Sequence, residues 1–120
     1  MDREKLKIIK IGLDIDNQTH TTKTHTKILR YENIIERYNV YKSAGGNGLH
    51  FELYLKRPVS IGESFKMREN LGDDQKRLTF SKADFLRGWD FDILFTYKKV
   101  MNEKRKYVWK KRKFLKEVIL

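Results

Sequence analysis

The sequence contains no cysteine and a single proline among its 120 residues. Without cysteine the chain can form neither a disulfide framework nor a zinc-thiolate site, so a hydrophobic core has to stabilise it. No segment approaches the roughly 18 uninterrupted apolar residues of a membrane span, and the charged N-terminus MDREKLKIIKIG lacks the apolar stretch of a signal peptide. We therefore expect an intracellular, cytoplasmic protein that does not associate with a membrane.

Acidic residues are also scarce relative to basic ones. The chain has 27 Lys and Arg against 16 Asp and Glu, which gives a formal net charge of +11. An excess of this size favours a polyanionic partner, such as nucleic acid or an anionic membrane. Hydrophobic residues make up 39% of the chain, which excludes a disordered basic protein, and the length suits one domain.

The first half of the sequence contains two stretches in which apolar and polar residues alternate. Residues 5–16 predict a half-buried strand whose polar side carries Asp14 and Asp16. Residues 40–58 predict a hairpin with a glycine-rich turn, in which the second strand is the alternating one. Between them, the threonine-rich residues 17–27 predict a loop, and the apolar spacing over 27–39 predicts a helix.

The remaining elements complete the predicted fold. Ser60 and Glu63 have the spacing of a capping box and predict a helix over 60–72 that ends at Gly72. RLTFS (77–81) and DFDILFTYKKV (90–100) predict two further strands. The order of elements indicates an α+β fold, an antiparallel sheet with two helices on one face, as in ferredoxin-like and RNA-recognition-motif folds. We assign residues 1–97 to this domain and residues 98–120 to a basic C-terminal extension.

The extension carries ten Lys or Arg and two Glu, and so supplies +8 of the formal charge. Two structures are predicted for the extension. Its apolar residues fit one face of a helix, or MNEKRKY forms the turn of a hairpin that is followed by a final short helix. Aromatic rings among basic residues suit stacking on single-stranded nucleic acid, whereas a solvated basic helix or a dimer contact is the alternative. The candidate nucleic-acid-binding residues are Lys106, Trp109, Lys110, Lys111, Arg112 and Lys113, together with Tyr54 of the alternating strand, whose ring could equally be a packed one.

Two groups of residues in the sheet suit phosphate chemistry. Asp14 and Asp16 project from the same side of one strand, where two carboxylates can hold Mg²⁺ or Mn²⁺ and, through it, phosphate oxygens. The alternative is a pair of solvated surface acids. The SAGGNGLH turn brings Ser43, backbone N–H groups and His50 toward one place, and such a turn can approach a phosphate closely. An ordinary hairpin loop with a surface histidine is the alternative here.

The motifs IGLDID and SAGGNGLHFEL together resemble the first two motifs of the archaeo-eukaryotic primase superfamily, over about residues 8–97. The resemblance implies a sheet like that of the RNA-recognition motif and metal-dependent nucleotidyl transfer in DNA replication. It implies Asp14 and Asp16 as catalytic metal ligands, and Ser43 and His50 as contacts to a nucleotide triphosphate. The family's third motif adds an aspartate on a neighbouring strand. The candidate strand here has Ser81 instead, which indicates a minimal or a degenerate member.

Several alternatives stay open. Asp73, Asp74 and Asp84 are candidates for a displaced third ligand, and Arg77 either contacts a phosphate or neutralises Asp73 or Asp74. Besides nucleotidyl transfer, the residues suit a non-catalytic module that binds single-stranded nucleic acid, and a metal-dependent nuclease. A partner subunit could complete the site.

Overall fold

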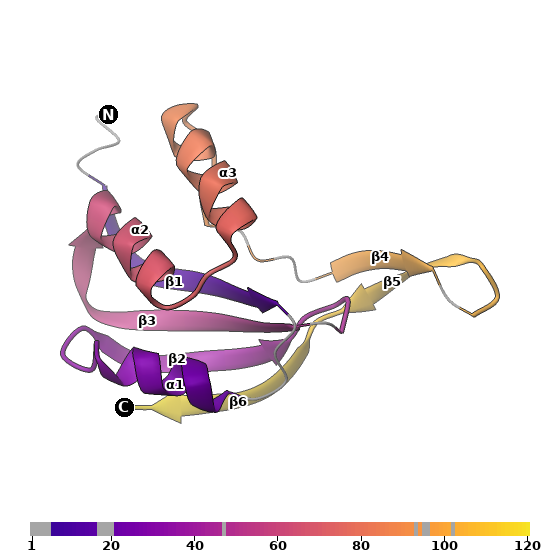
Figure 1. Cartoon of the computed structure of the whole chain (residues 1–120), viewed down its shortest axis with the longest axis horizontal. Coiled ribbons are helices and arrows are strands. Elements are labelled where there is room, and N and C mark those ends of the chain that lie inside the picture. The colour runs from indigo at the N-terminus through magenta and orange to yellow at the C-terminus, as the bar shows by residue number, and fades with distance from the viewer. Residues whose placement is uncertain (1–5, 17–20, 47, 93, 95–96, 102) are drawn as a thin grey trace.

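The computed structural model describes residues 6–16, 21–46, 48–92, 94, 97–101 and 103–120. The described residues form three helices and six strands (Figure 1). Four strands make an antiparallel sheet in the order β1-β3-β2-β6, and β4 and β5 make a separate two-stranded sheet. The predicted α+β class with an antiparallel sheet is therefore confirmed, and the described chain contains one helix more than expected.

The centre of the sheet is the predicted pair of alternating strands. β1 (Lys7–Asp16) and β3 (Gly48–Ser60) run antiparallel, with Leu13 opposite Phe51 and Asp14 opposite His50. β2 (Ile35–Lys42) pairs with the other side of β3. Because side chains alternate along a strand, this register sends the apolar residues of all three strands to one face and the polar residues to the other.

Two helices cover the apolar face of the sheet (Figure 1). α1 (Thr22–Leu29) contributes Ile28 to the core, and α2 (Ile61–Asn70) contributes Met67. The predicted capping box of α2 is confirmed, since Oγ of Ser60 accepts a hydrogen bond from the backbone N–H of Glu63 at 3.1 Å. The strand residues buried with these helices are Ile11, Leu13, Ile15, Ile35, Tyr38, Val40, Leu49, Phe51, Leu53 and Val59.

The helix predicted over residues 27–39 is wrong, as is the loop over 17–27 where that prediction reaches α1. The apolar positions with helical spacing belong to two elements: Ile28 lies in the last turn of α1, whereas Ile35 and Tyr38 lie in β2. Pairing of β2 with β3 satisfies its backbone and buries both side chains, so tertiary context overrides the local pattern.

The strand predicted over RLTFS is also wrong, because these residues lie in α3 (Gln75–Leu86). The Asp74 carboxylate accepts a hydrogen bond from the backbone N–H of Arg77 at 2.8 Å and caps the helix. Arg77 and Ser81 therefore do not share a strand face, and Ser81 does not stand on a strand beside Asp14. α3 lies beyond the β1 edge of the sheet (Figure 1).

The basic extension forms three strands. Of the two forms predicted for MNEKRKY, the hairpin is the one present, between β4 (Tyr97–Met101) and β5 (Tyr107–Lys111). The final short helix is wrong, because residues 113–119 form β6 (Lys113–Ile119), which pairs with β2 and packs Val118 against the core. The extension thus supplies the fourth strand of the main sheet. None of the described helices is long and apolar enough to cross a membrane.

Candidate functional site

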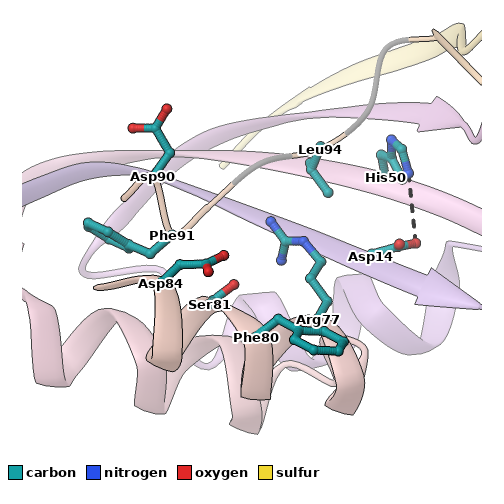
Figure 2. A pocket seen from close by; sticks show the side chains of 9 residues that line it. All are labelled: Asp14, His50, Arg77, Phe80, Ser81, Asp84, Asp90, Phe91 and Leu94. Atoms are coloured by element: carbon teal, nitrogen blue, oxygen red, sulfur yellow. Dashed lines mark ion pairs between the residues drawn. The ribbon is translucent and has the colours of Figure 1, made fainter. Parts of the chain in front are cut away.

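Asp14 and His50 face each other across the β1–β3 pair and line one pocket. Nε2 of His50 lies 3.8 Å from Oδ1 of Asp14, the contact drawn as a dashed line in Figure 2. Arg77 reaches the same pocket from α3, and the cavity measures about 330 Å³. The structure thus brings together three of the predicted site residues. The other lining residues are Phe80, Ser81, Asp84, Asp90, Phe91 and Leu94.

The two facing groups have perturbed protonation. Burial, with the added charge of the Asp16 carboxylate, raises the pKa of Asp14 to about 6, although Arg77 opposes the shift. Burial and the nearby guanidinium of Arg112 lower the pKa of His50 to about 4. At neutral pH the 3.8 Å contact is therefore between a carboxylate and a neutral imidazole. Nδ1 of His50 is buried, and no described residue hydrogen-bonds to it.

Asp16 and Ser43 lie at the end of the strands rather than in this pocket. Asp16 pairs with Gly48 and lines a neighbouring cavity of about 420 Å³, which Asp14 also lines. A Cβ atom on Gly48 would lie 2.5 Å from the carbonyl oxygen of Ile15, so the close approach of β1 and β3 requires glycine there. Oγ of Ser43 accepts a hydrogen bond from the N–H of Gly48 at 3.2 Å, which closes the turn.

A buried carboxylate next to Asp14 is fully engaged with arginines. The side chain of Asp73 is 0% exposed, and its Oδ2 receives Nε of Arg68 at 2.7 Å and Nη1 of Arg77 at 2.6 Å. Its Oδ1 accepts the backbone N–H of Asp14 at 2.8 Å. Arg68 also donates to Oγ of Ser81 at 2.8 Å. This network fixes α2 and α3 to the edge of β1 and accounts for the serine at position 81.

Arg77 is held on its other side by an acid that the sequence did not single out. It forms an ion pair with Asp92 and donates to the carbonyl of Gly12 at 3.1 Å. Oδ2 of Asp92 accepts the N–H of Gly12 at 2.9 Å, and a Cβ on Gly12 would lie 2.8 Å from Oδ1 of Asp92. The predicted ion pair between Arg77 and Asp73 is confirmed, whereas Asp92 lies 80 positions from Gly12 in sequence and no local pattern connects them.

On the polar face of the sheet, arginine and tyrosine side chains surround Glu52. Nη2 of Arg112 lies 2.7 Å from Oε1 of Glu52, and the Arg112 guanidinium lies 3.7 Å from the centre of the Tyr41 ring. The Tyr54 hydroxyl donates to Glu52 at 3.2 Å, and Arg37 lies 3.9 Å from the centre of the Tyr54 ring. Of the residues predicted to bind nucleic acid, Arg112 and Tyr54 are thus engaged with partners inside the fold.

The other predicted nucleic-acid contacts lie on the β4–β5 hairpin or beside it. Lys106 is in the turn, Trp109, Lys110 and Lys111 are exposed in β5, and Lys113 begins β6 opposite Lys42. These residues are not among those that line the two pockets at Asp14.

The residues at Asp14 fit part of a magnesium or manganese site. Carboxylate oxygens are the ligands that these hard cations prefer, and the raised pKa of Asp14, caused by burial and by neighbouring acids, reflects negative charge that a cation would neutralise. Asp73 and Asp92 are engaged by arginines. Within the described ranges there is no group of three or more His, Asp or Glu that could hold a metal. Asp74 lines the same cavity as Asp14 and Asp16, but its carboxylate caps α3. The residues that could hold such a cation are therefore Asp14 and Asp16, with phosphate or water oxygens as further ligands.

The sequence was compared with known proteins. It is 38% identical over 64 residues to "Uncharacterized protein 30" of Sulfolobus islandicus filamentous virus (isolate Iceland/Hveragerdi), a match that covers 48% of this chain and 23% of the relative. The chain thus spans about a quarter of that relative's length. No solved structure matches the chain. No protein-family model matches it either.

Proposed function

We propose that this chain binds a nucleotide triphosphate in the Asp14–His50 pocket and performs metal-dependent nucleotidyl transfer, as its resemblance to primase-polymerases implies. The observation that carries the proposal is the pairing of Asp14 with His50 across two strands, with Arg77 beside them. A carboxylate suits a cation, and an imidazole N–H and a guanidinium suit phosphate oxygens. The buried, unpartnered Nδ1 of His50 supports a polar ligand at this place.

Each residue has a distinct role in this proposal. Asp14 and Asp16 would hold Mg²⁺ or Mn²⁺, which supplies charge stabilisation at the transferring phosphoryl group. His50, with its pKa lowered to about 4 by burial, stays neutral and donates a hydrogen bond without adding charge. Arg77 adds positive charge and is oriented by Asp73 and Asp92. Ser43 holds the turn that precedes His50.

The fold supports this proposal at the level of its core. The run β1-α1-β2-β3-α2, with both helices on one face, is compatible with the ferredoxin-like and RNA-recognition-motif architecture. β6 extends the sheet beside β2, and the β4–β5 hairpin is a further addition. We propose a relationship to that architecture for residues 7–70.

A second candidate function is a non-catalytic module of the same fold that binds single-stranded nucleic acid. The observation in its favour is that Asp73, which lines one cavity with Asp14 and Asp16, is neutralised by Arg68 and Arg77 and so is not available as a third metal ligand. Weaker metal binding would remove much of the charge stabilisation on which the transfer rate depends. Nucleotide and nucleic acid could still bind.

The test is incorporation of a labelled nucleotide on a single-stranded template with Mg²⁺ or Mn²⁺. We expect Asp14→Asn to lower the rate about a hundredfold or more, because it removes a cation ligand from the transfer site. Asp90→Asn is the matched control: it makes the same carboxylate-to-amide change at an exposed residue that lines the same pocket, and should change the rate less than threefold.

Three results decide between the candidates. Incorporation that falls only in Asp14→Asn supports the enzyme. Binding of labelled strand and nucleotide without incorporation, under either metal, overturns the enzyme and leaves the binding module. Cleavage of the labelled strand without added nucleotide identifies a metal-dependent nuclease instead.

A further inference from the structure

The β4–β5 hairpin is a projecting arm, defined here as residues 97–111. Its two strands form a sheet of their own, and Figure 1 shows them pointing away from the four-stranded sheet. An isolated two-stranded hairpin has too little core to be held together by burial. The arm therefore contributes its surface rather than a core.

That surface is strongly basic. The arm contains seven Lys or Arg and one Glu, Glu103. The turn contains Arg105, whose φ of 57° lies in the left-handed region that favours glycine. A charge density of this kind is complementary to a phosphate backbone.

The arm also exposes large aromatic rings to solvent. Tyr107 is 63% exposed and Trp109 is 70% exposed. Alternation along β5 puts both on one face with Lys111, and leaves Val108 and Lys110 on the other. In register, Met101 lies opposite Tyr107 and Lys99 opposite Trp109. One face of the arm thus combines aromatic and basic residues along one strand.

The spacing of Tyr107 and Trp109 along β5 is commensurate with that of stacked bases. Residues two apart on an antiparallel strand are separated by about 6.8 Å, twice the roughly 3.4 Å rise between stacked bases. Tyr107 and Trp109 can therefore receive one base between them or two bases in succession. Base faces are accessible in a single strand and covered in a duplex, so the aromatic face fits a single strand.

We propose that the arm binds single-stranded nucleic acid, with Tyr107 and Trp109 stacking on bases and the surrounding lysines contacting phosphates. This inference goes beyond the proposed transfer chemistry, because the arm residues are outside both pockets described at Asp14. It also separates the predicted nucleic-acid contacts into two sets. Trp109, Lys110 and Lys111 belong to the arm, whereas Arg112 is held by Glu52 on the sheet.

The experiment measures fluorescence anisotropy of a labelled 20-nucleotide thymidine strand with the full chain at several salt concentrations. We expect Trp109→Ala to weaken binding about tenfold and Tyr107→Ala with Trp109→Ala about a hundredfold, whereas Trp109→Phe stays within threefold. Trp89→Ala is the matched control. Trp89 is 60% exposed but lies outside the arm, in the segment after α3, and loss of its ring should change the affinity less than twofold.

Several results would overturn the inference. These are equal weakening by Trp89→Ala and Trp109→Ala, a duplex of the same length bound as tightly as the single strand, and binding to vesicles rich in phosphatidylserine without binding to the strand. Asp14→Asn separates this inference from the proposed function. If that variant binds the strand as the wild type does, the arm acts independently of the transfer site, whether or not incorporation is found.

Discussion

Asp14 and Asp73 are neighbouring acids at the edge of β1, but their carboxylates differ in burial and in hydrogen-bond partners. The Asp73 carboxylate is fully buried and receives two arginines and two backbone N–H groups, those of Asp14 and Asp74. The Asp14 carboxylate is 28% exposed and faces a neutral imidazole, with Asp16, Asp73 and Asp74 nearby. Burial and these acids raise the pKa of Asp14 to about 6.

This difference separates a structural acid from a candidate functional one. A buried carboxylate contributes to stability when its charge and its hydrogen-bonding positions are satisfied by the protein. A half-buried carboxylate without such compensation destabilises the fold, and groups of this kind concentrate at functional sites. The contrast predicts that removing the Asp73 carboxylate lowers the free energy of unfolding, whereas neutralising the Asp14 carboxylate raises it. The two residues are in direct contact, since the backbone N–H of Asp14 donates to Oδ1 of Asp73.

The largest expected effect is that of Asp73→Ala. The variant leaves the Arg68 guanidinium, which is 1% exposed, buried without its carboxylate, and should lower the free energy of unfolding by about 3 to 5 kcal/mol. Urea denaturation measures the loss. Asp84→Ala is the control, since the half-buried Asp84 pairs with the exposed Arg87 at 3.7 Å and its removal should change stability by less than about 1 kcal/mol. Equal losses in the two variants would contradict the structural role of Asp73.

Asp14→Asn should instead stabilise the protein. Because the pKa of Asp14 is raised to about 6 by burial and by Asp16, against 3.8 for the unperturbed group, the folded state binds the proton more tightly than the unfolded state does. Stability is therefore lost as the pH rises from 3.8 toward 6, and the full loss applies above pH 6. We expect the amide to raise the free energy of unfolding by about 1 to 2 kcal/mol at pH 8, with no difference below pH 4. Urea denaturation at both pH values measures the change.

A cation provides the second readout for Asp14. Mn²⁺ should raise the melting temperature of the wild type at pH 8, because a ligand that binds only the folded state stabilises it. It should leave Asp14→Asn unaffected. An amide variant that is less stable than the wild type at pH 8 would show that the Asp14 charge is compensated and would remove the contrast with Asp73.

The sequence predicted the elements whose local patterns agree with their tertiary surroundings. The alternating residues of β1 and β3 face the core as expected, and Ser60 caps α2. The prediction failed between residues 22 and 42, where Ile28, Ile35 and Tyr38 mimic one helix but belong to α1 and β2. It failed again at RLTFS, which lies in α3, a helix whose first turn is capped by Asp74.

The candidate site divides in the same way. The resemblance of IGLDID and SAGGNGLHFEL to two primase motifs implied that Asp14 and His50 share a site, and the clear strand patterns of both segments placed them on neighbouring strands. The partners of Arg77 could be predicted only in part. Asp73 lies four residues before Arg77, so their ion pair could be expected from the spacing in sequence. Asp92 contacts Gly12 and Arg77 only because the chain after α3 passes back over β1. Contacts of that kind depend on the assembled fold.

Substitution of Glu52 should have the smallest effect on stability. Glu52 is a direct comparison for Asp14, because it lies on the same polar face of the sheet but its charge is compensated by Arg112. Burial alone would raise the pKa of Glu52, yet the hydrogen bond and charge of Arg112, with the ammonium of Lys10, outweigh burial and hold the pKa below its ordinary value. A depressed carboxyl pKa stabilises the fold above the unfolded value of 4.5, and the contribution is lost as the pH falls through the folded value.

Glu52→Gln should therefore destabilise the protein by about 1 kcal/mol at pH 7, and the difference should shrink as the pH is lowered below 4.5. Thermal and urea denaturation at pH 7 and pH 3 measure it. Glu36→Gln is the control, since Glu36 lies exposed on β2 and its substitution should be neutral. The amide at position 52 destabilises where the amide at position 14 stabilises, since Arg112 compensates the Glu52 carboxylate, whereas burial and the neighbouring acids disfavour the charge of the Asp14 carboxylate. Changes of the same sign in both variants would contradict that distinction.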